Sequence, residues 1–434
     1  MKIPFVTLAT AASVVNAAYP GDIVYYWVDQ SATFVNGTVI GGLQSPPSSW
    51  SQAIVQAAVY QAAVKSKHES LEFQQLAVSH AAHNALLWVF HGTRLYNPID
   101  AALRAIIPRI GLDPNSAKGK DAVRTGQTAA AKVASARADD KITNFVDFAY
   151  GPKEPGVYQQ SPGSNPFPDT PQARYITPFV ALGDITRFRA PPPPKPDSVE
   201  YEAQILYVKE IGELNSTTRS VYDTDTAYFW RESSITGWNR LAGAVVGSKL
   251  ATDVPASAKF YAQLNYALAN AGFASWDTKF TYLTWRPDTA LHHPTPFVHS
   301  NTSLTTPSWT PLLRPTPSHP DYVSTHSTFG GAAAAVIRAW NSAYNGAGKG
   351  KGKGNGGDDD GDVIDATLSS TVTLDNRGVI TRRYTSLRAA AEENSKSRVF
   401  GGIHFPFAGV EGIALGERVA LATLDKFDAN WDKF

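Results

Sequence analysis

The stretch PSHPDYVSTHSTFGGAAAAVIRAW, residues 317–340, joins a polar, proline-containing segment to an apolar, alanine-rich run that favours a helix. Two of the ten histidines of the chain, His319 and His326, stand seven residues apart where this helix should begin. The N-terminus of a helix presents unpaired N–H groups and a partial positive charge, and therefore favours anions. A histidine at that place could donate a proton to a bound anion or accept one from it.

Two cations come from the segment KFTYLTWRP, residues 279–287. Their spacing of seven predicts that Lys279 and Arg286 lie on one face of a helix, two turns apart. Pro287 disfavours helical backbone at the residue before it, so the Arg286 guanidinium should lie where this helix frays.

A third cation, Arg398, precedes His404 in the segment SRVFGGIHF, whose two glycines permit a close backbone approach. Around the central motif, the Ser324 hydroxyl and the Thr325 N–H add two hydrogen-bond donors. Because an arginine fork binds two oxygens at once, such a set suits a tetrahedral, phosphate-like oxyanion. Two histidines, His326 and His404, are then left to do chemistry on that anion.

The three segments resemble the signature of the superfamily of vanadium-dependent haloperoxidases and type-2 phosphatidic acid phosphatases. That signature is K-x6-RP, then PSGH, then SR-x5-H, and this chain gives KFTYLTWRP, VSTH and SRVFGGIH in the same order. The resemblance runs from about residue 50 to the end of the chain. Val323 and Thr325 stand where the family has proline and glycine. Threonine keeps the N–H that the family uses, but its branched side chain could crowd the oxyanion.

The resemblance implies a role for each matching residue. His404 would be the axial ligand of vanadate, or the nucleophile on phosphorus in a phosphatase. His326 would be the general acid/base. The groups implied to hold the equatorial oxygens are Lys279, Arg286, Ser324, the Thr325 N–H and Arg398.

Two further positions concern the halide. Trp276 falls where fungal chloroperoxidases of the family carry a tryptophan near the halide site. His319 falls where bromoperoxidases of the family carry histidine and chloroperoxidases carry phenylalanine. A histidine there should titrate near neutral pH, and it predicts oxidation of bromide and iodide with little chloride oxidation.

Helical periodicity dominates the chain. Segments such as SWSQAIVQAAVYQAAVKSKHE and FAGVEGIALGERVALATLDKF repeat apolar residues at helical spacing, and long alternating β-branched runs are scarce. We therefore expect a mostly α protein packed as helical bundles. The resemblance implies two four-helix bundles.

The expected organisation begins with a signal peptide at 1–18, because the chain opens with a lysine, an apolar run and small residues before AYPGD. An N-terminal helical bundle should span 19–190, up to the stiff connector RAPPPPKPD. A C-terminal bundle at 191–434 should carry the oxyanion site and a low-complexity surface loop at 345–362.

Composition supports secretion and limits the partners. There are no cysteines, which excludes disulfides and thiolate metal sites. A formal net charge of +1 gives no basic field for nucleic acid, and no stretch past the N-terminus has the ~20 apolar residues that a membrane span needs. N-glycosylation sequons begin at Asn36, Asn215 and Asn301, as in an exported glycoprotein. The sequence carries no signal for an oligomeric state.

The favoured function is vanadate-dependent oxidation of halide by hydrogen peroxide to hypohalous acid, with a small organic acceptor as the final partner. Phosphate can occupy the same site. One alternative is a metal-free acid phosphatase acting through a phosphohistidine at His404. Another is a secreted, non-catalytic anion-binding protein in which Thr325 blocks chemistry. Other histidine pairs stay open: His80 and His83 as metal ligands or core residues, and His292 and His293 as an entrance or a surface.

Overall fold

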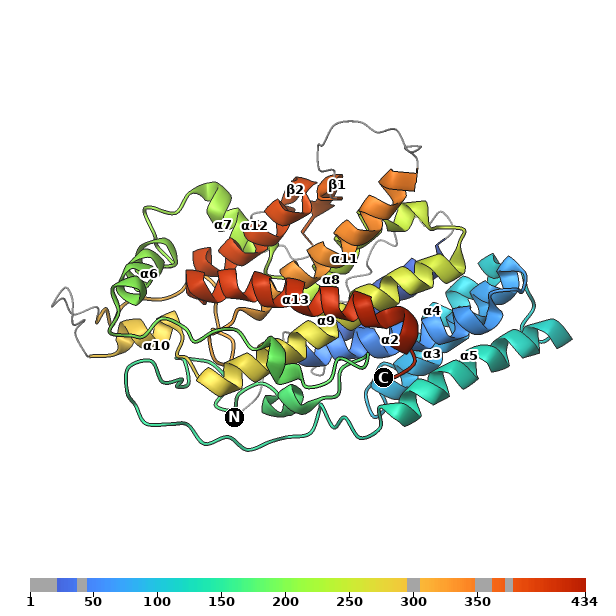
Figure 1. Ribbon diagram of the computed structural model, residues 1–434, viewed down its shortest axis with the longest axis horizontal. Helices are drawn as coiled ribbons and strands as arrows, with labels where there is room; N and C mark the ends of the chain where they lie inside the picture. The colour runs from blue at the N-terminus through green and yellow to red at the C-terminus, as the bar shows by residue number, and fades with distance from the viewer. Residues whose placement is uncertain (1–21, 37–44, 295–304, 348–360, 371–377) are drawn as a thin grey trace, which may run out of the picture.

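The protein is described by a computed structural model that covers residues 22–36, 45–294, 305–347, 361–370 and 378–434. The predicted signal peptide and most of the predicted low-complexity loop lie outside these residues. Regular structure in the described part is almost entirely helical (Figure 1), which confirms the mostly α prediction.

The α-helices, in chain order, are α1 (Ile23–Asn36), α2 (Ser45–Ser66), α3 (Leu71–Val89), α4 (Tyr96–Ile110), α5 (Ala117–Ala136), α6 (Val199–Ile211), α7 (Val221–Phe229), α8 (Ser234–Val245), α9 (Val254–Tyr282), α10 (Pro287–His292), α11 (Thr325–Ala347), α12 (Leu387–Phe400) and α13 (Pro406–Asn430). Short 3-10 helices are η1 (Pro171–Tyr175), η2 (Ile185–Phe188) and η3 (Gly247–Lys249). The two strands are β1 (Val363–Ser369) and β2 (Thr381–Ser386).

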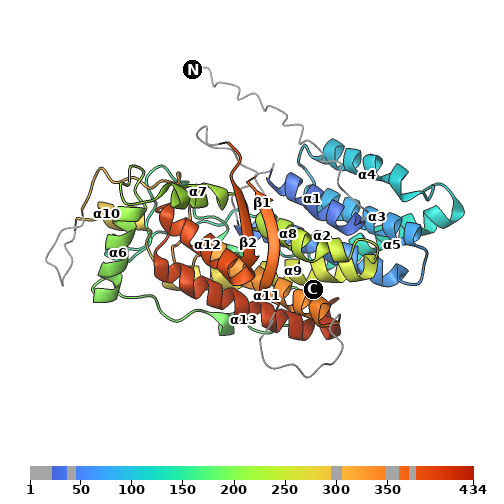
Figure 2. The same cartoon turned by 90° about the horizontal axis from the view of Figure 1, so that it is seen from above.

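The helices form two groups that meet along α9. Helices α2, α3, α4 and α5 pack together at one end of the molecule, and α11, α12 and α13 pack together toward the other (Figures 1 and 2). Helix α9 contacts α2, α11 and α13. It is buried along almost its whole length, and α2 is buried nearly as completely. A helix that is apolar on all sides belongs in such a core, and α9 therefore supplies a rigid support for the residues at its C-terminal end.

Irregular backbone connects the two groups. Residues 137–198 run from α5 to α6 with only the two short helices η1 and η2, and the polyproline segment 189–197 is non-helical, as predicted. Among the described residues the regular strands are a single antiparallel pair, β1 with β2, in which β1 alternates buried and exposed residues. The boundary predicted at residue 190 stays a prediction. Helix α2, which precedes this residue in the chain, packs on α9, which follows it. No helix in the described part of the chain is long and apolar enough to cross a membrane.

Candidate active site

The C-terminal end of α9 positions the first two cations. Lys279 lies in its last turn, and Leu283 ends the helix with left-handed backbone, at φ 48°. Arg286 is extended, at φ −89° and ψ 158°, and caps α10. The prediction that both cations share one helical face is therefore wrong, because the chain turns between them. The effect predicted for Pro287 is confirmed: it starts α10 and leaves Arg286 outside any helix.

The start of α11 carries the central motif. The Ser324 N–H donates to the Ala408 carbonyl at 2.8 Å, and the Ser324 hydroxyl oxygen accepts from the Ser327 N–H at 3.4 Å. As the first helical residue, Thr325 has no carbonyl one turn earlier in α11 to take its N–H. The Thr325 hydroxyl lies 2.9 Å from the Ser275 hydroxyl of α9. The hydroxyl of the branched Thr325 side chain is therefore oriented toward α9 by this hydrogen bond.

The third segment turns sharply between α12 and α13. Gly402 has φ 73°, and a β-carbon there would clash with the carbonyl of Gly212. The Ile403 N–H donates to the Arg398 carbonyl at 3.1 Å. This turn, which needs glycine, brings His404 back beside the end of α9.

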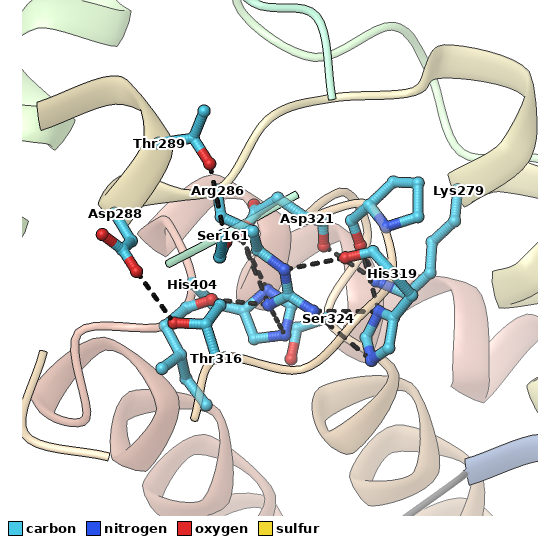
Figure 3. A network of polar contacts seen from close by, with 12 residues as sticks. Ser161, Lys279, Arg286, Asp288, Thr289, Thr316, His319, Asp321, Ser324 and His404 are labelled. Atoms are coloured by element: carbon cyan, nitrogen blue, oxygen red, sulfur yellow. Dashed lines mark hydrogen bonds and ion pairs between the residues drawn. The ribbon is translucent and has the colours of Figure 1, made fainter. Parts of the chain in front are cut away.

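Arg286 is the centre of the cluster that results (Figure 3). Its Nη1 lies 3.0 Å from Nε2 of His404, and its Nη2 lies 2.9 Å from Nδ1 of His319. It also donates to the carbonyls of His319 and Ile403, while Lys279 donates to those of Pro320 and Asp321. Because a guanidinium can only donate, Nε2 of His404 must be the acceptor and carry a lone pair.

Asp321 completes the cluster, although it was not predicted from the sequence as a site residue. Its side chain is fully buried, with Oδ1 2.9 Å from Nδ1 of His404 and 3.8 Å from Nη1 of Arg286. The contact with His404 has ion-pair distance but not hydrogen-bond alignment, and no other described group takes a hydrogen bond from Nδ1. The signal in the sequence was a carboxylate between two predicted site histidines. No feature of the neighbouring sequence linked Asp321 to His404, which lies 83 positions later.

Positive charge is in excess here. Lys279, Arg286 and Arg398 are all buried, and among the described residues Asp321 is the only carboxylate within ion-pair distance of any of them. Burial lowers the pKa of all three cations, and Arg286 lowers the pKa of Lys279 and Arg398 further. Burial raises the pKa of Asp321 to about 7, although Arg286 and Lys279 oppose this. Buried charge of one sign calls for a counter-ion, so the residues present fit an oxyanion such as vanadate or phosphate.

His404 and His326 both lie in the positive electrostatic field of these cations. Burial, and then Arg286 and Lys279, hold the pKa of His404 well below its usual value. Burial, and then Arg398, do the same to the pKa of His326. Nε2 of His326 has no hydrogen-bond partner among the described residues. Both rings are therefore neutral in the free protein and able to accept a proton when an anion arrives.

Trp276 and His319 lie side by side and are both buried. Their ring centroids are 4.8 Å apart, and the Trp276 indole N–H donates to the Asp169 carbonyl at 3.0 Å. The prediction that His319 titrates near neutral pH is wrong for the free protein. Burial, and then Lys279 and Arg286, hold its pKa well below the usual value.

The other histidine pairs lie apart from this cluster. Nε2 of His83 lies 2.7 Å from Asp100 Oδ1, and the described residues contain no group of three or more His, Asp or Glu arranged to hold a metal ion. The two nitrogens of His292 lie 2.7 Å from the Asp288 carbonyl and 3.2 Å from the Pro307 carbonyl. The His293 ring lies 5.5 Å from the Trp285 ring. These contacts favour structural roles for both pairs.

Known proteins share these features. A family model described as the VCPO second helical-bundle domain matches residues 259–433. Vanadium chloroperoxidase of Curvularia inaequalis is 27% identical over 296 residues, which are 55% of this chain and 47% of that protein, so the chain spans about half the length of this relative.

Solved structures show the same fold. A bacterial vanadium-dependent iodoperoxidase superposes with a TM-score of 0.71 at 20% identity, over 94% of this chain and 98% of that one. An apo-type bacterial vanadium-dependent chloroperoxidase gives 0.68 at 16% identity, over 91% and 96%. With the three motifs in order and the helical architecture, these matches lead to one conclusion. Residues 259–433 resemble the VCPO second helical-bundle domain, and the chain has the fold of vanadium-dependent haloperoxidases.

Proposed function

We propose that this protein is a vanadate-dependent haloperoxidase that uses hydrogen peroxide to oxidise bromide or iodide to hypohalous acid, which then halogenates a small organic acceptor. The observation that carries the proposal is the cluster of three buried cations around His404, with one carboxylate among the described residues in ion-pair distance. A tetrahedral or trigonal-bipyramidal oxyanion supplies the missing negative charge. The similarity of this protein to the relatives named above supports the same activity.

The donors suit vanadate in particular. Lys279, Arg286, Arg398, the Ser324 hydroxyl and the Thr325 N–H would hold its oxygens, and Nε2 of His404 would provide the bond to the metal. Bound there, vanadate supplies a Lewis acid that activates peroxide. Before it can bind, Arg286 must give up part of its present contacts with His404 and His319. The cations then stabilise negative charge in a site from which bulk water is excluded.

His326 is placed to move protons. Its Nε2 is without a partner, and its pKa is lowered mainly by burial and then by Arg398. A bound oxyanion would offset the positive field and raise this pKa toward the range in which a histidine exchanges protons at neutral pH. His326 would then take a proton from hydrogen peroxide as it binds and return a proton to the departing oxygen.

The preference for bromide and iodide rests on His319. Its ring packs on Trp276 and faces Arg286, so it lies beside the proposed anion. An imidazole at this place can hydrogen-bond the bound oxygens and compete with the cations that activate them. Chloride is harder to oxidise than bromide or iodide and needs the most activated peroxide.

A metal-free acid phosphatase is the second candidate. One observation favours it: a neutral His404, whose Nε2 lone pair is held toward Arg286, could attack phosphorus directly. Phosphate and vanadate would then use the same donors.

The deciding experiment uses purified full-length protein stripped of bound anions. It is assayed with and without orthovanadate, in bromide plus peroxide and, separately, with an aryl phosphate ester. We expect bromide oxidation that requires vanadate and is inhibited by phosphate. Ester hydrolysis without vanadate, with no bromide oxidation, would transfer the proposal to the phosphatase. Anion binding with neither activity would leave a binding protein.

Secretion is part of the proposal. It is supported by the apolar N-terminal run with small residues before AYPGD and by the exposed position of Asn215 in one sequon. N-terminal sequencing of protein recovered from the culture medium should begin near Ala18 or Tyr19. Full-length protein retained inside the cell would contradict it.

A further inference from the structure

A crevice of about 280 Å³ lies in the irregular segment that connects the two helix groups, between residues 143–146 and 165–172. Of the residues that line it, only Pro47, at the start of α2, comes from outside that segment. Its lining shares no residue with the oxyanion cluster. The volume is near the lower end of the range for small-molecule sites, and it suits one substituted ring.

Exposed apolar side chains gather on the walls of this crevice. Phe145 is 70% exposed, Phe167 is 44% exposed and Val146 is 37% exposed. The two phenylalanine rings meet edge to face, with centroids 5.0 Å apart and planes at 84°. Large apolar side chains that are exposed together in a concave surface are typical of a binding site. Because a third ring can pack on this pair with the same geometry, the walls favour an aromatic ligand.

Two polar atoms of the lining residues lack partners. The Thr170 hydroxyl and the Gln172 side-chain oxygen are buried and make no hydrogen bond within the described part of the chain. The Gln172 amide nitrogen donates to the carbonyls of Ile142 and Asn144 at 2.9 and 2.7 Å, so its oxygen is the end that stays unpaired. Thr170 also has left-handed backbone, at φ 44° and ψ 58°, which is strained for a β-branched residue and typical of functional sites. A ligand hydroxyl can donate to the glutamine oxygen and accept from the threonine hydroxyl.

The charge of the crevice is opposite to that of the active site. Asp169 is the only charged residue among those that line it. A carboxylate on the ligand would be repelled by this side chain, whereas an uncharged ligand would not. Walls, polar atoms and charge together favour an aromatic ring that carries a hydroxyl group and no negative charge.

Asp169 also joins the crevice to the active site. Its N–H donates to the Ser318 carbonyl at 2.7 Å, and its carbonyl accepts from the Trp276 indole N–H at 3.0 Å. The Ser318 hydroxyl donates to the carbonyl of Asn165, another lining residue, at 3.1 Å. Trp276 packs in turn on His319, with ring centroids 4.8 Å apart. The crevice is therefore connected directly to the two aromatic rings beside the proposed anion.

We propose that this crevice binds the organic acceptor of the reaction, and that the acceptor is an uncharged, electron-rich arene such as a phenol. Hypobromous acid released from the active site then reaches a ring that is held close to its source. A ring carbon ortho to the hydroxyl attacks the bromine, so that a C–Br bond forms and the Br–O bond breaks. The ring carbon loses its proton to the departing hydroxide, which leaves as water. The halogenation step rests on the proposed function, whereas binding of the phenol does not.

Binding is measured by calorimetric titration of protein without vanadate or peroxide. The probes are 3-(4-hydroxyphenyl)propionamide and the matching carboxylate, 3-(4-hydroxyphenyl)propionate, which differ only in the charge at the end of the chain. The amide should bind several-fold more tightly than the carboxylate, and Asp169→Asn should narrow this difference. Phe167→Ala should weaken binding of the amide by roughly three- to tenfold, because the ligand loses an aromatic contact. Phe145→Ala should act in the same direction.

Tyr96→Ala is the matched control, because Tyr96 is an aromatic residue at the start of α4 that is 60% exposed. It should change the affinity for neither probe. In vanadate-loaded protein with bromide and peroxide, the two probes then compete in one vessel. Hypobromous acid in free solution should brominate them about equally, since their rings are alike. The enzyme should favour the amide several-fold, and Phe167→Ala should lose this preference.

Two results would separate this proposal from the proposed function. Equal bromination of the two probes by the enzyme, with equal affinity for the amide in the Phe167→Ala and Tyr96→Ala variants, would overturn the proposal and leave the peroxidase activity standing. Binding of the amide that depends on Phe167, in a protein without peroxidase activity, would support the crevice as a phenol site and refute the proposed function.

Discussion

Two histidine–aspartate pairs, one half-buried and one fully buried, occupy the two helix groups of this protein. In the N-terminal group, His83 of α3 lies 2.7 Å from Asp100 of α4. In the C-terminal group, His404 lies 2.9 Å from Asp321. In each pair one imidazole faces one carboxylate at similar distance, but the His83 contact is a hydrogen bond, whereas the His404 contact lacks hydrogen-bond alignment.

Their surroundings differ in charge. Asp100 is also contacted by the exposed Arg104, and the neighbouring His80 has its pKa lowered to about 4, by burial and then by His83. His404 and Asp321 lie instead among buried cations with a positive excess. A histidine–carboxylate pair by itself only satisfies the polar atoms of a buried imidazole ring. The uncompensated charge around it is what makes an anion site.

The largest expected effect separates the two histidines directly. His404→Ala should abolish vanadate-dependent halide oxidation and tight vanadate binding, because it removes the proposed bond from the protein to the metal. His83→Ala should leave halide oxidation and vanadate binding unchanged when both are measured on the folded fraction of the variant. Steady-state bromide oxidation and vanadate titration of both variants test this. Retained activity in His404→Ala would contradict the assignment of the site.

The next effect concerns proton transfer. His326→Ala should lower kcat by roughly 10²- to 10⁴-fold, the range typical of a general acid/base, and leave vanadate bound because the three cations remain. Turnover is measured at saturating peroxide and vanadate, with vanadate content determined in the same samples. A variant that loses its vanadate would show that His326 holds the anion and does not only move protons.

The carboxylates of the two pairs provide a sharper test. Asp321→Asn should weaken vanadate binding by roughly 10- to 100-fold, since a group that orients a ligand histidine typically contributes that much. Sulfate, which forms no bond to His404, should bind as well as before or better, because a negative charge has been removed. Asp100→Asn should change neither affinity. A parallel loss of sulfate and vanadate binding would reduce Asp321 to a structural residue.

Protonation gives a smaller effect. The pKa of His326 is lowered in the free protein, and a bound anion should raise it, so between these two pKa values the complex holds one more proton than the free protein. Sulfate affinity should therefore increase as pH falls, by up to about tenfold per pH unit. Calorimetry in buffers of different ionisation enthalpy should detect the proton uptake, and His326→Ala should diminish it. His80→Ala is the matched control and should leave it intact.

The smallest effect is on halide choice. His319→Phe should raise chloride oxidation relative to bromide oxidation by a few-fold. The gain should be largest at mildly acid pH, where a bound oxyanion has raised the pKa of His319 and the unmodified ring is protonated. Ratios of kcat/KM for the two halides across this pH range provide the measurement. An unchanged ratio would show that the ring does not touch the reacting oxygens.

Local sequence determined much of the molecule. Helical periodicity predicted the mostly α fold, and Pro287 correctly predicted extended backbone at Arg286. The helix start at Thr325 followed from a polar segment that ends in a run of good helix formers. These features depend on neighbours along the chain, so they can be derived without knowing the fold.

Only the tertiary structure decided the site around those motifs. The spacing of Lys279 and Arg286 suggested one helical face, but Leu283 turns the chain and Arg286 reaches His404 from beyond the helix. Asp321 meets His404 across 83 residues, and Thr325 meets Ser275 across 50. Such contacts arise from the packing of α9, α11 and the turn before α13. A motif fixes which residue types are present, whereas the burial that shifts their pKa values and leaves a net positive charge exists only once the helices have packed.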